Sequence, residues 1–472
     1  MRLILLLIFK KFNVKIYRLF GRMVLVTIIC ISLTYCSPKT TSINLPIDTP
    51  ENFSVQGVTE TPDKWWTVFE DEQLNSLIDS ALQNNMDLQT TWYRLQESQA
   101  IIDRVSAEMY PSFDGSAQAE INNRQSEFQQ SQRFRIGLYS EYEIDLWGRI
   151  NSSVEAQQFR AAASFEDYQT AVISLSAEIS RTWYNLVVAT NQLQLAENQV
   201  ETNEKTLSLI KIRFGSGQIR GVDILRQIQL LEATKEQKIN AELNVKILEN
   251  QLAVLVGKSP QEKPGYLLPP LPEPPALPDP GIPATLIQRR PDVRSAYNLL
   301  QAADREAAAA ISNKYPRLTL SASISSGAYD IEDLFTDLGR GIAANLLAPV
   351  FRGGELNAEA DRAEALKQQR LYQYGNVVLT AFREVEDALV QEQKQIQIIK
   401  SIQEQVELAA KTIEQLKTEY LNGMSNYLDV LTALDEEQQL RRDLLRAKLA
   451  LIEYRIALYR ALAGGLESQQ NL

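Results

Sequence analysis

Residues 259–291 read SPQEKPGYLLPPLPEPPALPDPGIPATLIQRRP, and this proline-rich connector decides how the chain is organised. Proline lacks the backbone N–H and fixes φ, so the connector cannot form the interior of a helix. Sequence features that precede the connector return after it at a nearly constant offset. These are Tyr110-Pro111 and Tyr315-Pro316, Asp87-Leu88 and Asp292-Val293, and Gly217 with Asp223 and Gly423 with Asp429. The spacing predicts two similar halves joined by one crossover.

The repeat sets the expected domain organisation. A chain of 472 residues would ordinarily suggest about three domains, but a twofold repeat points to one duplicated body. We expect a signal peptide at 1–35, a first repeat at 36–258, the connector at 259–285, a second repeat at 286–466 and a tail at 467–472.

The N-terminus has the pattern of a secretion signal. Residues 1–35 carry six Lys or Arg and no acidic residue, and an apolar run covers Val24 to Leu33. The sequence Leu33-Thr34-Tyr35-Cys36 resembles a bacterial lipobox, so we expect Cys36 to be the lipidated first residue of the mature protein. The alternative is that Cys36 is an incidental cysteine of the apolar segment, as Cys30 is.

Composition excludes several classes of function. The formal net charge is −11 and no basic stripe is present, which argues against a nucleic-acid partner. The chain has no histidine, so it cannot form a Ser-His-Asp or Cys-His nucleophilic site or a histidine-containing metal site. We therefore expect no enzyme activity, no cofactor and no metal site.

Each half contains a predicted strand hairpin. Apolar and polar residues alternate with a period of two over 113–121 and 133–146 around a polar loop, Asn122 to Gln132, and again over 318–325 and 342–350. Strands of about ten residues with one apolar face suit a tilted membrane barrel. The alternation alone leaves open a sheet of a soluble protein packed on helices. No run of about 18 apolar residues follows Cys36, so we expect no helical membrane span.

Each hairpin is followed by a predicted long helix. Arg149 to Phe214 contains no Gly or Pro, and Glu355 to Leu421 contains only Gly375. Apolar residues recur every three or four positions in both, which indicates packing against a neighbouring helix with supercoiling. At about 1.5 Å per residue, each helix would span about 100 Å.

The long helices end at turn signals in equivalent positions of the two halves. Gly215-Ser216-Gly217 follows the first and Asn422-Gly423 the second, and helices are expected to resume after Asp223 and Asp429. We expect returning helices over 224–256 and 430–463. A further helix is expected before each hairpin, over 74–109 and 286–314.

Short motifs then resemble those of a known family. The stretch that begins at Trp65-Trp66 is similar to the outer-membrane efflux family, the TolC-like outer membrane factors, and to their OprM/NodT-type lipoprotein branch. The resemblance covers essentially the whole mature chain. Its other motifs are Leu146-Trp147-Gly148-Arg149, Arg289-Arg290-Pro291-Asp292-Val293, Phe351-Arg352-Gly353-Gly354 and Leu462-Ala463-Gly464-Gly465.

The expected fold is mainly α with a transmembrane β part. Each half supplies a hairpin, a long helix and a returning helix, which gives four strands per protomer. Four strands are too few for a barrel, because about eight form the smallest natural one. The resemblance implies a homotrimer with a twelve-strand β-barrel continued by a helical, α-barrel tube.

The resemblance also implies a function. It implies a passive gated exit duct in the outer membrane of a Gram-negative bacterium, lipid-anchored and extending into the periplasm. Its partners would be outer-membrane lipid, a periplasmic adaptor and an inner-membrane transporter of the RND or ABC type, and its cargo small molecules such as drugs, toxic compounds or metal ions. The alternative is a lipid-anchored periplasmic coiled-coil scaffold without transport activity.

The resemblance assigns a periplasmic gate to the second turn. Leu428 matches a position where relatives place an occluding leucine, and Thr432 stands where OprM-like members carry an aspartate ring. Asp429 lies nearby. The turns themselves depend on Gly217 and Gly423, and Asp223 and Asp429 can instead be read as N-caps of the returning helices.

Overall fold

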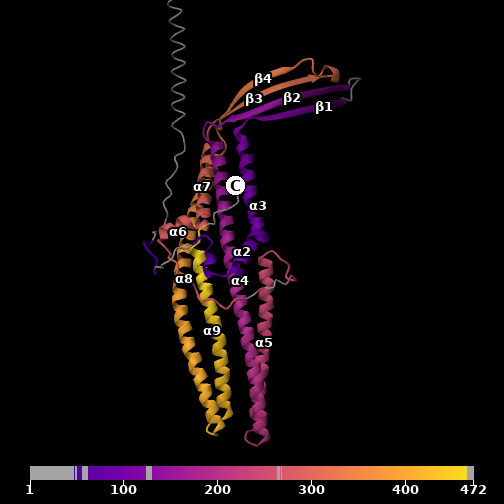
Figure 1. Ribbon diagram of the computed structural model, residues 1–472. Helices are drawn as coiled ribbons and strands as arrows, with labels where there is room; N and C mark the ends of the chain where they lie inside the picture. The colour runs from indigo at the N-terminus through magenta and orange to yellow at the C-terminus, as the bar shows by residue number, and fades with distance from the viewer. Residues whose placement is uncertain are drawn as a thin grey trace, which may run out of the picture. The chain divides into compact units, whose positions relative to one another are not determined.

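The computed structural model describes residues 47, 50–55, 62–123, 130–262, 266 and 268–464. Cys36 and the expected signal peptide lie outside these residues. The elements follow in the order η1 (Trp65–Phe69), α2 (Glu72–Asn84), α3 (Met86–Ser106), η2 (Ala107–Met109), β1 (Ser112–Asn123), β2 (Gln130–Ile144), α4 (Arg149–Gly215), α5 (Gly221–Leu255), α6 (Pro283–Arg289), α7 (Pro291–Ser312), β3 (Arg317–Ala328), η3 (Ile331–Asp333), β4 (Gly339–Leu347), α8 (Glu355–Leu421) and α9 (Tyr427–Leu462) (Figure 1).

The chain divides into two compact units. Each of the helices α3, α4, α7 and α8 begins in one unit and ends in the other. The strand unit includes Gln96–Ala162 and Tyr297–Gln373. The helical unit includes Ile47–Leu95, Ala163–Ala296 and Tyr374–Leu472. No helix in the described part of the chain is both long enough and apolar enough to cross a membrane.

The strand unit is built on one antiparallel sheet in the order β1-β2-β3-β4 (Figure 1). The hairpins β1–β2 and β3–β4 each join neighbours in the sequence, and β2 pairs with β3 to bring the two halves of the chain together. In this register Leu138 lies between Gly115 of β1 and Ile324 of β3. The predicted hairpins are therefore parts of a single four-stranded sheet.

The two faces of the sheet differ in chemistry. Because successive side chains point to opposite faces, the register collects most of the apolar residues of the four strands on one face. This apolar face includes Phe113, Ala117, Ile136, Leu138, Tyr142, Leu320, Ala322, Ile324, Ile342, Ala344 and Leu346. The polar face includes Asp114, Ser116, Gln118, Arg133, Arg135, Tyr139, Glu141, Glu143, Thr319, Ser321 and Ser323.

The strands depart from the predicted bounds at their ends. β1 and β2 extend into the predicted loop, because backbone pairing continues through Asn122 and Ser131 although the sequence there is polar. β2 ends at Ile144 and β4 at Leu347, so Leu146 and Val350, which we assigned to strands, lie beyond them. The alternation of side chains fixed the faces, but it carries little information about where pairing stops.

The helices of the strand unit are joined by ion pairs. Arg305 Nε lies 3.2 Å from Glu155 Oε2, and Arg160 pairs with Glu306, so α7 is tied twice to α4. Lys367 Nζ lies 2.8 Å from Asp304 Oδ1 and ties α8 to α7. Small residues pack between the charged ones: Ala307, Ala310 and Ala363 form a buried cluster that allows the helices to approach closely.

The core of the helical unit is aromatic. The ring of Trp65 stacks on Tyr459 with centroids 5.9 Å apart, and Phe69 contacts Tyr184 at 5.4 Å. Trp183 Nε1 donates to Asp71 Oδ2 at 2.8 Å, while the other carboxylate oxygen of Asp71 accepts the first backbone N–H groups of α2. The segment that begins at Trp65 thus anchors α4 and α9 in one buried cluster.

Two helices expected to be continuous are each broken once, at equivalent positions of the two halves. The predicted helix 74–109 divides at Asn85 into α2 and α3, and the predicted helix 286–314 divides at Arg290 into α6 and α7. Asn85 has extended backbone angles and its side chain accepts from Leu88 N, so it ends one helix and caps the next. Pro291 favours the second break, because the residue before proline avoids the helical region.

The residues at both breaks are buried and contact the end of a returning helix in the same way. Asn85 Nδ2 donates to the carbonyl of Leu255 at 2.9 Å, and Arg290 Nη1 donates to the carbonyl of Ala461 at 3.2 Å. Leu255 and Ala461 are themselves equivalent in the two halves. The two halves therefore use different side chains to bond equivalent carbonyls that have no partner within their own helix, near the C-terminus of each returning helix.

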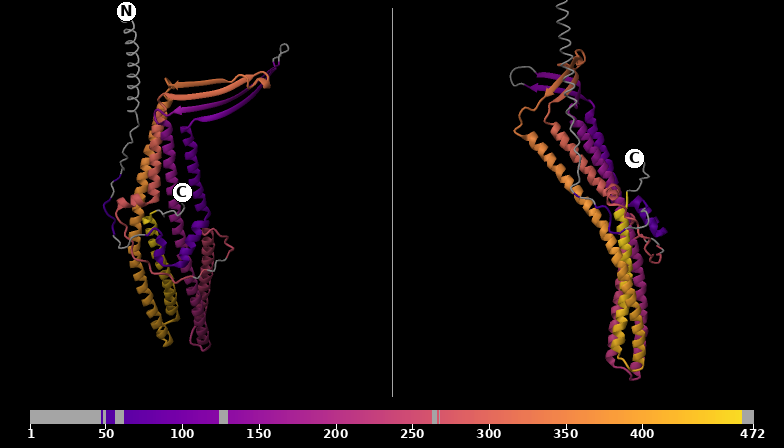
Figure 2. Two further views of the ribbon diagram at one scale, coloured as in Figure 1. Left: turned by 45° about the horizontal axis from the view of Figure 1, so that its top comes forward. Right: turned by 90° about the vertical axis from the view of Figure 1, so that its left-hand side faces the viewer.

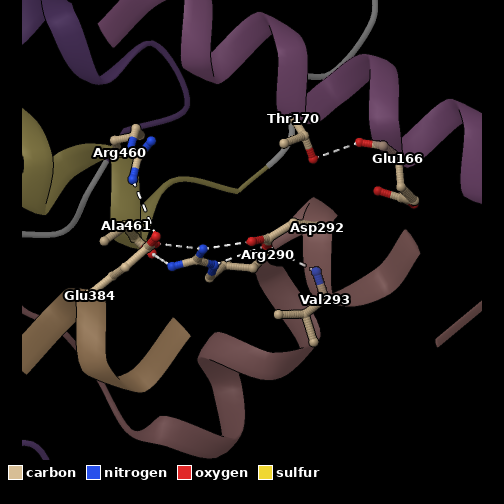
Figure 3. Close-up of polar contacts among 8 residues, drawn as sticks. All are labelled: Glu166, Thr170, Arg290, Asp292, Val293, Glu384, Arg460 and Ala461. Atoms are coloured by element: carbon tan, nitrogen blue, oxygen red, sulfur yellow. Dashed lines mark hydrogen bonds and ion pairs between the residues drawn. The ribbon is translucent and has the colours of Figure 1, made fainter. Parts of the chain in front are cut away.

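Arg290 additionally centres an ion-pair network (Figure 3). Its guanidinium donates to both oxygens of Asp292, at 3.0 and 2.6 Å, and to Glu384 Oε2 at 2.8 Å. Arg460 donates to the other Glu384 oxygen at 3.3 Å. The bidentate geometry is the strong form of such a pair, and it joins α7, α8 and α9.

In its described residues the proline-rich connector forms no helix before α6 begins at Pro283. Pro283 occupies the first helical position, where its missing N–H costs nothing. Part of the connector is held by Arg455 of α9, which forms a buried ion pair with Glu392 of α8 and also donates to the carbonyl of Pro275. This residue joins the returning helix of the second half to the segment between the halves.

Candidate functional site

The two turns at the ends of the long helices have the same backbone geometry. Gly217 and Gly423 have φ values of +72° and +76°, in the left-handed region that favours glycine. Gln218 N donates to Arg213 O at 3.0 Å, and Met424 N donates to Glu419 O at 2.9 Å. These bonds satisfy the last carbonyls of α4 and α8, in the manner of a Schellman motif.

The returning helices begin earlier than the sequence suggested. Their N-cap residues are Arg220 and Asn426, and Asp223 and Asp429 stand three positions later, inside the first helical turn. The interpretation of the two aspartates as N-caps is therefore corrected. Asn426 Oδ1 accepts from Asp429 N at 3.2 Å, and Asp223 Oδ2 accepts from Arg220 N at 3.3 Å.

Tyr427 links the second turn to the helices of the first half. Its side chain is 3% exposed, and its hydroxyl donates to Gln227 Oε1 of α5. Gln227 Nε2 donates in turn to the carbonyl of Asn203 on α4 at 3.0 Å, and Asn203 Nδ2 donates to Thr234 Oγ1 at 2.9 Å. A continuous buried hydrogen-bond chain thus runs from α9 through α5 to α4.

A second aromatic residue packs beside this link. The ring of Tyr420 lies 5.5 Å from that of Tyr427, and the guanidinium carbon of Arg213 lies 4.6 Å above the Tyr420 ring. Ile210 and Val430 complete the apolar cluster. Burial raises the pKa of both tyrosine hydroxyls; the neighbouring Tyr420 and Asp223 add to the effect at Tyr427, and Arg213 opposes it at Tyr420.

Asp223 is buried among arginines. Its side chain lies 3.8 Å from Arg220 Nη2 and 3.9 Å from Arg226 Nη1, and the carboxylate oxygen that faces both has no hydrogen-bond partner among the described residues. The carboxylate stabilises the start of α5 by its charge as well as by its bond to Arg220 N, because the N-terminus of a helix favours negative charge.

The residues expected to form the gate lie together on the outside of the protomer. Leu428 is 42% exposed, and Asp429 and Thr432 are also exposed. Thr432 Oγ1 donates to the carbonyl of Leu428 at 2.9 Å, and Ser425 Oγ donates to Asp429 Oδ2 at 3.1 Å. The structure places these three on α9, whereas Gly217 and Asp223 belong to the other turn.

The sequence interpretation missed the buried residues behind that surface. Tyr427, Gln227 and Asn203 connect the turn to the rest of the helical unit, and none was a predicted site residue. A signal was present, because Asn203 occupies one position of the otherwise apolar seam of the first long helix. A polar residue in such a seam usually has a specific partner.

Comparison with known proteins gives a consistent result. The chain is 28% identical over 424 residues to the pyoverdine export outer membrane protein OpmQ of Pseudomonas aeruginosa, covering 86% of this chain and 88% of that protein. It is 26% identical over 457 residues to the cation efflux system protein CusC of Escherichia coli, covering 93% of this chain and 98% of that protein.

Solved structures and family models lead to the same family. The solved structure of the outer-membrane channel OprN has a TM-score of 0.83 and 26% identity, and the match covers 91% of this chain and 99% of that one. This match confirms a mainly helical fold with a small antiparallel sheet. The family model for outer membrane efflux proteins matches residues 77–258 and 282–464. The chain belongs to the outer membrane efflux protein family, as its motifs predicted.

Proposed function

We propose that this protein is the outer-membrane exit duct of a tripartite efflux or secretion system. In this proposal three protomers form a passive, gated channel that a periplasmic adaptor joins to an inner-membrane transporter of the RND or ABC type. The observation that carries the proposal is the four-stranded sheet, with its apolar face and its two outer strands. Ile342 and Leu346 of the apolar face are 90% and 68% exposed in the protomer.

The sheet is incomplete as it stands in one protomer. Among the described residues, β1 pairs only with β2 and β4 only with β3, so each outer strand leaves one row of backbone groups without strand partners. Such edges cannot face lipid, because hydrocarbon offers no hydrogen bonds. Pairing β1 of one copy with β4 of the next removes every edge, and three copies supply twelve strands, enough for a closed barrel. The apolar face then meets lipid and the polar face lines the lumen.

The gate follows from the second turn. Leu428, Asp429 and Thr432 are exposed in the protomer, so they are available to meet their counterparts in other copies. Three leucines at a threefold axis would pack together and occlude the lumen, and three carboxylates would form a cation-attracting ring. The Tyr427–Gln227 link holds this surface to α5, so opening moves the turn as a unit or breaks the link.

The anchor and the cargo complete the proposal. Acylation of Cys36 would add a lipid anchor to the barrel, in the manner of a lipoprotein. The relatives are named for different cargoes, pyoverdine for OpmQ and cations for CusC, so the cargo proposed here is the broad class of small molecules, including drugs, toxic compounds and metal ions.

Cross-linking between the outer strands tests the assembly. We propose to combine Ser116→Cys on β1 in turn with Gly341→Cys, Ala343→Cys and Asn345→Cys on β4, in protein oxidised in its native membrane. At least one combination should give covalent trimers on a denaturing gel, because β1 and β4 of one chain lie at opposite edges of the sheet and can meet only between copies.

A matched pair inside the sheet serves as the control. Glu141 and Ser321 face each other across β2 and β3 of one chain, so Glu141→Cys with Ser321→Cys should oxidise without joining chains. Covalent species that stop at dimers, or the absence of cross-linked species from all three β1–β4 combinations, contradict the trimeric barrel.

A further inference from the structure

The charged residues of the polar face lie mainly on β1 and β2 and form two bands, and Arg317 of β3 lies on the same face at the helix end. At the loop end of the hairpin, Arg133 and Arg135 of β2 form an arginine band. At the helix end, Asp114 of β1 with Glu141 and Glu143 of β2 forms a carboxylate band. The side chains between the bands are uncharged and mostly small: Ser116 pairs with Gly137, which pairs with Ser325.

Arg135 has no charged neighbour in the ladder. Its partners across the strands are Gln118 on one side and Gly327 on the other, and its side chain is exposed. Within the part of the sheet that the structure describes, no carboxylate forms an ion pair with it. Arg133, also exposed, lies opposite Glu120. Of the two arginines, Arg135 therefore presents the less compensated charge.

The carboxylate band is compensated in part, by Arg149 and by Arg317 of β3, which stands two positions before the ladder partner of Glu143. Arg149, at the start of α4, holds both oxygens of Glu143 at 3.1 and 3.0 Å. Asp114 and Glu141 are exposed and have no ion-pair partner among the described residues. With three carboxylates and two arginines, the band keeps a net negative charge.

The two bands are far enough apart to act separately. Arg135 is four positions along β2 from the level of Asp114, which pairs with Tyr139, and six from Glu141, which corresponds to about 13 and about 20 Å of strand. The screening length at physiological ionic strength is about 8 Å, so the field of each band is largely screened before it reaches the other. An ion on the polar face therefore meets first one sign of charge and then the other.

We propose that Arg135, supported by Arg133, sets the anion permeability of the duct near its outer opening, and that Asp114 and Glu141 set cation permeability at the other end of the barrel. The inference rests on the proposed function, because it requires the polar face to line a lumen. A ring formed by three copies of each band has low-dielectric walls around it, which strengthens its field.

Arg340 provides a matched control on the same sheet. It pairs with Ile324 and so lies on the apolar face, three residue positions from the level of Arg135. The proposal assigns no role in permeation to Arg340, although it is exposed and carries the same charge.

The test is the reversal potential of purified trimers in planar bilayers under a KCl gradient. Arg135→Gln should raise the permeability ratio of K⁺ to Cl⁻ by about twofold or more, Arg135→Lys should keep the wild-type ratio, and Glu141→Gln with Asp114→Asn should lower it. Arg340→Gln should leave the ratio unchanged. Heat-stable trimers on a gel verify that each variant has assembled.

Three results would contradict the proposal. If Arg135→Gln trimers conduct with an unchanged permeability ratio, the arginine band does not set anion permeability. If Arg340→Gln shifts the ratio as much as Arg135→Gln does, the shift depends on the net charge of the protein and not on the polar face. The absence of conductance from wild-type trimers contradicts the duct itself, and the bands with it.

Discussion

Leu428 and Val222 occupy equivalent positions in the two halves of the chain, each one residue into a returning helix. Their exposures are nearly the same, 42% and 41%. An aspartate follows each of them, Asp429 and Asp223, but the residues that precede them differ, Tyr427 before the leucine and Gly221 before the valine. Only the leucine is assigned to the gate, so the valine is its natural comparison.

We predict that Leu428→Ala raises single-channel conductance in planar bilayers. The leucine is exposed in the protomer, so truncation should leave protomer stability nearly unchanged. It should instead remove packing at the threefold axis, worth about 1 kcal/mol per half-buried leucine. Val222→Ala should leave conductance at the wild-type level. Unchanged conductance in assembled Leu428→Ala trimers would exclude this leucine from the gate.

The hydroxyl of Tyr427 predicts a response to alkaline pH. Burial raises the pKa of this group above its usual value of about 10, so the folded turn binds the proton more tightly than the unfolded chain. The stability contributed by Tyr427 is fully present below about pH 10 and is lost as pH rises above it. Breaking the bond from Tyr427 to Gln227 is one way to open the proposed gate. Conductance should therefore increase above about pH 10, and less so in Tyr427→Phe. An equal alkaline response in both proteins would contradict a role for Tyr427.

At the scale of elements, the sequence predicted the long helices well and their breaks poorly. Both bounds of α8 agree with the prediction, because Gly353-Gly354 and Asn422-Gly423 punctuate it strongly. The break at Asn85 was missed, since the apolar pattern continues across it, and the contact of Asn85 with Leu255 joins residues far apart in the sequence. Local patterns carry turn chemistry, but they do not carry contacts between the ends of different helices.

The same limit applies to the candidate site. Glycine-containing turns located both helix ends, and the motif assigned Leu428 to the second turn, where the structure shows it exposed. The bond from Tyr427 to Gln227 depends on which faces of α5 and α9 meet, and neither helix encodes that choice locally. The sequence also did not predict that Asp223 is buried, with Arg220 at the N-cap and Arg226 of α5 beside its carboxylate.

In the first turn, alanine substitutions of two glycines that lie two residues apart are predicted to change stability in opposite directions. Gly217 has φ of +72°, so Gly217→Ala should destabilise the turn by about 1 to 2 kcal/mol from backbone strain alone, since an added Cβ meets no atom within 4 Å. Gly215 is the last residue of α4 and lacks a positive φ, so Gly215→Ala should stabilise it by about 0.5 to 1 kcal/mol. Hydrogen exchange of the amides in 211–220 measures both. Equal effects in the two variants would contradict the assigned backbone conformation.

The ion-pair network predicts that the second helix break is sensitive to substitution. Arg290→Ala leaves Asp292 and Glu384 without their shared cation, and we expect a loss of about 2 to 3 kcal/mol, after discounting for the partial exposure of both carboxylates. Arg290→Lys should recover only part of it, because an ammonium cannot form the bidentate contact. Arg181→Ala, which breaks an exposed pair with Glu178, should cost under about 0.5 kcal/mol. Thermal unfolding followed by circular dichroism compares them, and equal midpoints for Arg290→Ala and Arg181→Ala would be inconsistent with a central role for Arg290.

At the scale of the whole molecule, the proposed orientation puts the connections β1–β2 and β3–β4 outside the cell and the α4–α5 turn in the periplasm. We predict that Asp333→Cys, in η3 between β3 and β4, reacts with an impermeant maleimide on intact cells. Ser216→Cys, exposed in the α4–α5 turn, should react only after the outer membrane is permeabilised. The reverse pattern would invert the orientation.

The pairing of β2 with β3 constrains how the chain folds. The β1–β2 and β3–β4 hairpins are local, whereas placing Phe134 opposite Ala328 closes a loop that contains α4, α5 and the connector. Closing so long a loop is slow compared with forming a hairpin, because its entropy is lost before the contacts are gained. We therefore expect newly made chains to pass through a stage with two separate hairpins, each exposing apolar side chains to water. During that stage, capture by a chaperone competes with aggregation for the same surfaces.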